Sequence, residues 1–114
     1  MEFKKYQEET HKTAIFPPLT LAGEELTFIY PALGLEGEVG EVAENIKKII
    51  RDDGGYISEI RHNNLIKEIG DVLWYISELC TATGIDLDYV ASSNIEKLKD
   101  RQQRGVLQGS GNER

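Results

Sequence analysis

The sequence contains a single cysteine and three prolines, and no run of apolar residues approaches the ~20 needed to cross a bilayer. Cys80 alone cannot form an internal disulfide, so the composition fits a reducing compartment. Residues 1–6 are charged and lack the apolar centre of a signal peptide. We therefore expect a cytoplasmic protein with no membrane partner.

Positive charge is also scarce. Lys and Arg number 13 against 20 Asp and Glu, which gives a formal net charge of -7. Such a balance repels phosphate backbones, so we expect no nucleic-acid partner. A small polyphosphate can still bind if a divalent cation bridges it to the acidic protein.

Few segments are typical of strands, whereas apolar residues recur at helical spacing in several places, which predicts an all-α chain. Residues 1–14 form a short amphipathic pattern. Residues 32–51 carry the strongest stripe, and two further stripes follow residue 62 and Asp86. With 114 residues the chain suits one domain with a modest core, and assembly with other copies is plausible.

Breaker residues set the expected boundaries. Pro17 and Pro18 end the first helix, and Gly84 ends the third before Asp86 caps the fourth. For residues 21–30 we expect one or two helical turns. Residues 105–114 are glycine-rich and lack periodicity, so we expect a domain over residues 1–104 followed by a tail.

Two pairs of acidic residues flank the apolar stripes of the second and third predicted helices. A helix turns about 100° per residue, so Glu38 and Glu41 lie about 60° apart, and Glu68 and Asp71 are related in the same way. Both pairs fall at the edge of a buried stripe. If the two helices pack through these stripes, the four carboxylates lie together at one edge of the interface between the helices.

Four neighbouring carboxylates repel one another unless a divalent cation neutralises them. Their hard oxygen ligands favour Mg²⁺, Mn²⁺ or Ca²⁺, and Mg²⁺ commonly shares its coordination with substrate phosphates. The alternative is an ordinary solvated acidic surface. Glu44 lies a further ~60° round the helix from Glu41 and is either a third metal ligand from this helix or an ordinary surface residue.

Residues 38–41, Glu-Val-Gly-Glu, and residues 68–73, Glu-Ile-Gly-Asp-Val-Leu, resemble the ExxE…ExxD signature of MazG-like nucleotide pyrophosphohydrolases. Residues 33–104 resemble one complete domain of that family, and residues 104–111 resemble tails of its phage and prophage members. The resemblance implies a helical bundle of the all-α NTP pyrophosphatase type, assembled as a homodimer or homotetramer. It also implies cleavage of nucleoside triphosphates between the α and β phosphates, dependent on Mg²⁺ with Mn²⁺ as a substitute.

Carried over by position, the metal ligands become Glu38, Glu41, Glu68 and Asp71, with Glu41/Glu44 as the alternative first pair. We expect Glu41 to orient the attacking water or take its proton. On the fourth helix, residues at one edge of the apolar stripe suit phosphate contacts; they are Asn94, Lys97 and Arg101.

Three more residues have open assignments. Lys48 is a weaker candidate for a phosphate contact. Tyr75 could stack on a base or simply pack, and Trp74 is expected to point away from the acidic edge. Two rival functions remain, namely a phosphoribosyl-ATP pyrophosphohydrolase with the same fold and a non-catalytic helical module that binds metal or a partner.

Overall fold

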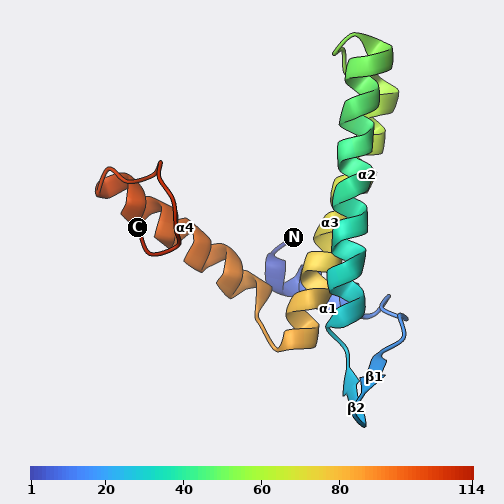
Figure 1. Cartoon of the computed structure of the whole chain (residues 1–114), viewed down its shortest axis with the longest axis vertical. Helices are drawn as coiled ribbons and strands as arrows, with labels where there is room; N and C mark the ends of the chain where they lie inside the picture. Colours follow the sequence, from blue (N-terminus) through green and yellow to red (C-terminus); the bar gives the residue numbers. More distant parts are fainter.

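A computed structural model describes all residues from Met1 to Arg114 and confirms the all-α class. A small antiparallel hairpin of two short strands interrupts the helices between α1 and α2 (Figure 1). The elements in chain order are α1 (Phe3–His11), β1 (Leu19–Leu21), β2 (Glu24–Leu26), α2 (Ile29–Asp53), α3 (Glu59–Thr83) and α4 (Leu87–Gln103).

The two longest helices, α2 and α3, run antiparallel and form the main body of the molecule (Figure 1). Part of each apolar stripe is buried between them, and Ile49 of α2 is only 3% exposed, whereas other stripe residues such as Val39 remain exposed. Gly54 ends α2 in the left-handed conformation, with φ of 62°. Across the connection, Arg61 Nε lies 2.7 Å from Asp53 Oδ2 and ties the two helix ends together.

Helix α1 crosses α3 and also holds the start of α4. Thr10 Oγ1 and Ser77 Oγ lie 2.7 Å apart in a buried hydrogen bond between α1 and α3. The Gln7 side chain donates to the Ile85 carbonyl at 2.9 Å and accepts from the Leu87 N–H at 3.0 Å. Helix α4 therefore starts from a fixed point on α1 and then leans away from the α2–α3 pair (Figure 1).

The expectation of helical turns over residues 21–30 is wrong for most of that segment. Leu19 pairs with Leu26 and Leu21 with Glu24, so a two-residue loop of Ala22 and Gly23 joins β1 to β2. Both loop residues have positive φ, 53° and 81°, which is the geometry of a tight hairpin turn. Helix α2 begins only at Ile29, two residues before Pro31.

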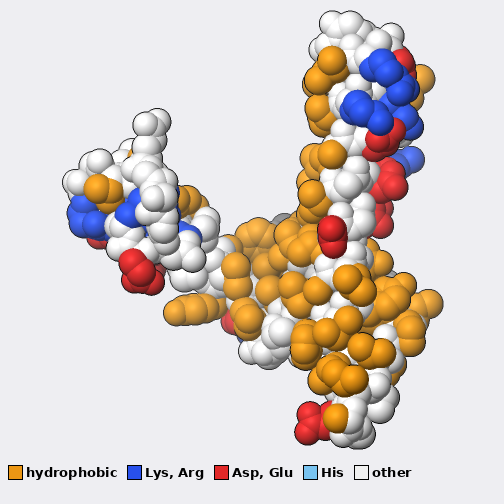
Figure 2. Space-filling view, viewed as in Figure 1, with side chains coloured by type: hydrophobic (Ala, Val, Ile, Leu, Met, Phe, Trp, Pro, Cys, Tyr) orange, Lys and Arg blue, Asp and Glu red, His pale blue; other side chains and the backbone are white.

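The isolated chain exposes much more surface than a compact monomer. Its accessible area is 8353 Å², whereas about 6,300 Å² is typical at this mass. Its radius of gyration is 17.5 Å, against about 13 Å for a compact domain of this length. Apolar side chains gather around the start of α2 and the strands (Figure 2), including exposed Leu19, Leu21, Tyr30 and Leu33. No helix combines the length and apolarity of a membrane span.

Candidate functional site

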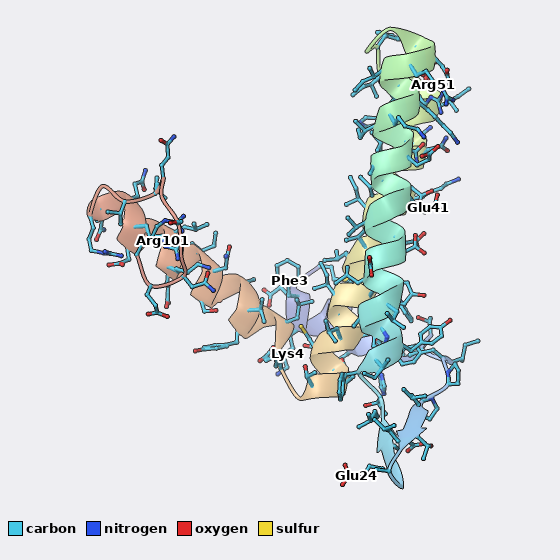
Figure 3. The ribbon with its side chains drawn as sticks, viewed as in Figure 1. Phe3, Lys4, Glu24, Glu41, Arg51 and Arg101 are labelled. Carbon is cyan, nitrogen blue, oxygen red and sulfur yellow. The ribbon has the colours of Figure 1, made fainter.

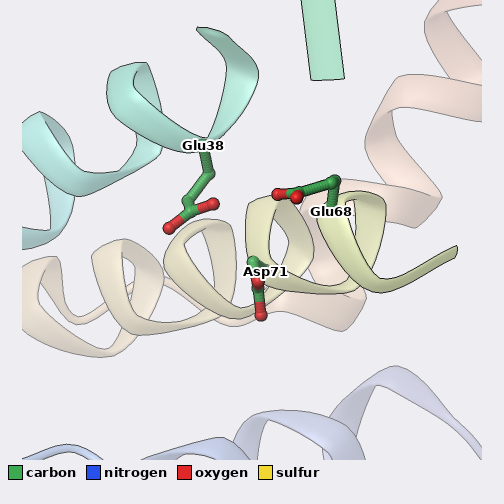
Figure 4. Close-up of side chains that lie close together, drawn as sticks. All are labelled: Glu38, Glu68 and Asp71. Atoms are coloured by element: carbon green, nitrogen blue, oxygen red, sulfur yellow. The ribbon is translucent and has the colours of Figure 1, made fainter. Parts of the chain in front are cut away.

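Three carboxylates converge where α2 passes α3. Glu38 points from α2 toward α3, which contributes Glu68 and Asp71 (Figure 4). Each offers one oxygen, and these oxygens all lie within 4.8 Å of one another. The spacing of three residues places Glu68 and Asp71 on one side of α3, and the antiparallel packing places Glu38 opposite them.

The cluster is electrostatically unfavourable by itself. Glu38 is half-buried, and its pKa is raised by burial and then by the charges of Asp71, Glu68 and Glu41. Folding thus places the carboxylate of Glu38 where its charge is disfavoured, and a bound cation would relieve that penalty. The oxygen-only donor set fits a hard divalent cation such as Mg²⁺.

A cavity of about 300 Å³ opens beside Glu38 and Asp71, and its other lining residues are Thr13, Trp74 and Tyr75. The indole Nε1 of Trp74 donates to Thr13 Oγ1 at 2.8 Å, which fixes this wall. Burial raises the pKa of Tyr75, and the nearby Tyr30, Glu38 and Asp71 raise it further. The cavity thus joins a carboxylate floor to an aromatic wall and has no basic residue in its lining.

Of the predicted ligands, Glu41 does not join this group of three. It lies one turn beyond Glu38 on α2, where its side chain is exposed (Figure 3). Glu44 pairs instead with Lys47 at 2.9 Å and with Lys48 at 3.9 Å. The roles predicted for Glu41 and Lys48 remain predictions, and Tyr75 does lie beside the cluster.

The α4 residues predicted to contact phosphate lie apart from the cluster within one chain. Asn94 and Lys97 are exposed on α4, which leans away from α2 and α3 (Figure 1). Arg101 lies on the same arm, well apart from Glu41 (Figure 3). Its side chain is only 4% exposed, and its Nη2 donates to the Asn112 carbonyl of the C-terminal tail at 2.9 Å.

The expectation that Trp74 points away from the acidic edge is wrong, because Trp74 lines the cavity with Asp71. Its place three residues after Asp71 was a usable signal, since such residues neighbour each other on a helix. Phe16 was also missed. It stacks on Tyr30 at 5.2 Å and meets Trp74 edge-on at 6.1 Å, yet it comes from a segment without periodicity.

Residues 30–106 match the family model of the MazG nucleotide pyrophosphohydrolase domain. The chain belongs to this family. It is also 39% identical over 109 residues to the Gene 37 protein of Mycobacterium phage L5, and the match covers 96% of each chain. This similarity supports a phage-type member of the MazG family. No solved structure matches the chain.

The MazG match spans Glu38, Glu68 and Asp71, so the carboxylate cluster belongs to the family's domain. Membership implies nucleotide pyrophosphohydrolase activity in general, with a nucleotide as substrate. Proteins of the MazG family are typically metal-dependent, and the acidic cluster agrees with that property.

Proposed function

We propose that the chain hydrolyses nucleoside or deoxynucleoside triphosphates to the monophosphate and pyrophosphate in an Mg²⁺-dependent reaction. Water attacks the α-phosphorus, and the bond to the bridging oxygen of the β-phosphate breaks. The observation that carries the proposal is the group of three carboxylates, Glu38, Glu68 and Asp71, beside an aromatic-walled cavity in a MazG domain.

Each residue of the site has a separate role in the proposed reaction. Glu38, Glu68 and Asp71 would hold Mg²⁺, which when bound neutralises phosphate charge and lowers the pKa of a coordinated water. A carboxylate oxygen of Glu41, exposed one turn further along α2, accepts the proton of the attacking water. Tyr75 lines one side of the cavity next to Glu38 and Asp71.

We further propose that the protein acts as a homodimer or a larger homo-oligomer. The surface in excess of a compact monomer is about 2,000 Å², which a stable interface would cover. A triphosphate also carries more negative charge than one divalent ion neutralises, and no basic side chain lines the cavity beside Glu38. The projecting α4 of a second copy is suited to supply Asn94 and Lys97, and Arg101 if the tail moves aside.

A nucleotide panel with separate detection of pyrophosphate and orthophosphate tests the reaction, with phosphoribosyl-ATP among the substrates. Asp71→Asn and Glu41→Gln should each lower kcat by about a hundredfold or more. The matched control is Asp88→Asn, an exposed residue on α4, which should keep wild-type turnover. Helical content by circular dichroism should be unchanged in all three. Release of orthophosphate alone, or near-normal turnover by Asp71→Asn at saturating Mg²⁺, would contradict the proposal.

A further inference from the structure

One buried carboxylate lies outside the group of three and has an oxygen with no partner. Glu78 of α3 is only 1% exposed. Its Oε2 lies 3.2 Å from His11 Nδ1 on α1, whereas its Oε1 has no hydrogen-bond partner. Leaving a buried carboxylate oxygen unsatisfied is costly, so such a group calls for an explanation.

Glu78 forms part of the wall of a second cavity, with a volume of about 380 Å³. The other lining residues are His11, Ala14, Phe16, Thr27, Thr81 and Ala82. A single water occupies roughly 30 Å³, so the space exceeds what an isolated ion or water needs. Phe16 supplies a flat aromatic surface and the alanines supply small apolar ones, which together suit a planar heterocycle.

The second cavity lies beside the first, and aromatic rings stand between the two. Phe16 lines the second cavity and meets the ring of Trp74, which lines the first, at 6.1 Å. Asp71 and Glu78 are seven residues apart on α3, so they share one side of the helix and lie about 10 Å apart along its axis. A nucleotide spans a distance of this order between its α-phosphate and the far edge of its base.

We propose that this second cavity receives the base of the substrate and that Glu78 selects guanine. The inference rests on the proposed function, because it assigns the base subsite of the same reaction. Guanine is the common base that presents two adjacent N–H donors, at N1 and the 2-amino group, and a carboxylate accepts such a pair. Adenine and cytosine place an acceptor nitrogen beside their amino group, and uracil and thymine flank one N–H with two carbonyls.

The contact with His11 is compatible with this role. A carboxylate oxygen has two lone pairs, so Oε2 can accept from both His11 and the ligand while Oε1 takes the second donor. The His11 side chain is 65% exposed, so it is free to move as the base enters. Glu78 is thus a specificity-determining residue, and the reacting phosphates remain at the cluster around Asp71.

The test compares kcat/KM for GTP with that for ITP, which lacks only the 2-amino group, and for ATP, CTP and UTP. Wild-type protein should prefer GTP over each of the others by about tenfold or more, the value of a hydrogen bond to a charged group. Glu78→Gln exchanges an acceptor for a donor and should raise KM for GTP by about tenfold with kcat retained. The exposed Glu96→Gln on α4 is the matched control and should keep the preference.

Guanosine and inosine binding without metal separates this inference from the proposed reaction. The single Trp74, beside Phe16, reports binding by fluorescence. Guanosine binding that Glu78→Gln weakens would uphold the base site even if no nucleotide were hydrolysed. Hydrolysis with equal kcat/KM for GTP and ITP would overturn the base site and leave the proposed reaction standing. If Glu78→Gln fails to fold, the comparison of GTP with ITP on wild-type protein still tests the base site.

Discussion

Gly34 of α2 lies so close to Tyr75 of α3 that a Cβ at position 34 would overlap the tyrosine ring. The missing side chain lets the ring of Tyr75 occupy the space beside Glu38 and Asp71, where it lines the first cavity. Gly34 therefore leaves the room that an aromatic wall of the candidate site needs, although it contributes no atom to that wall.

Gly34→Ala should destabilise the fold, because Tyr75 must shift to admit the new methyl group. Overpacking of this kind costs about 1–3 kcal/mol in the free energy of unfolding. Gly40→Ala is the control. Its added Cβ meets nothing within 4 Å, so it should stabilise the helix by roughly 0.5–1 kcal/mol. Urea unfolding at one protein concentration measures both, and equal destabilisation by the two variants would contradict the contact.

The raised pKa of Glu38 predicts how stability depends on pH without metal. A group whose folded pKa lies above its ordinary value of 4.5 favours folding most below 4.5, and that contribution is lost as pH rises through the folded pKa. The melting temperature of wild type relative to Glu38→Gln should therefore fall as pH rises above 4.5. The exposed Glu36→Gln on the same helix, outside the group of three carboxylates, is the matched control.

Mg²⁺ should stabilise the folded chain, because the unfolded chain scatters the three ligands. Mass action adds about 2.7 kcal/mol when free metal is near 100 times its dissociation constant. Since 1 kcal/mol shifts the melting temperature of a small domain by roughly 4 °C, the expected rise is several degrees. The rise should vanish in Asp71→Asn and fade below about pH 4. A chelator titration followed by melting measures it, and no shift with or without a nonhydrolysable triphosphate would count against the metal site.

The exposed apolar surface should be covered by a second copy in solution. Light scattering at micromolar concentration should therefore give at least twice the 12.8 kDa of one chain. Leu33 is 64% exposed near the start of α2, and Leu33→Lys should shift the protein toward monomer. Glu59→Lys, an exposed polar position at the start of α3, is the control. A wild-type monomer would contradict the assembly.

Helical periodicity predicted the parts of the structure that depend on one helix and its immediate partner. The pattern over 32–51 lies inside α2, and Gly84 and Asp86 act as the predicted stop and cap. The Asp86 side chain accepts from the Asp88 N–H at 3.0 Å. The pairing of Glu38 with Glu68 and Asp71 could also be predicted, because an edge position on each stripe fixes which side chains meet.

Features that depend on longer contacts could not be predicted in this way. The start of α4 is held by Gln7, whose side chain bridges to Ile85 and Leu87 from almost 80 residues away. Arg101 follows Lys97 at helical spacing, so its place on α4 could be predicted. Its burial could not, because the C-terminal tail that covers it has no periodic pattern in its sequence. Glu78 also gave no signal, since its burial results from the crossing of α1 over α3.

The three clustered carboxylates all belong to one helical hairpin, since only residues 54–58 separate α2 from α3. Closing so short a connection costs little chain entropy, and proteins rich in such local contacts fold fast. We expect the hairpin to assemble first, with its acidic site in place, and α1 to dock onto it later with His11 and Phe16. Cation binding would then already favour the hairpin during folding, before the second cavity exists.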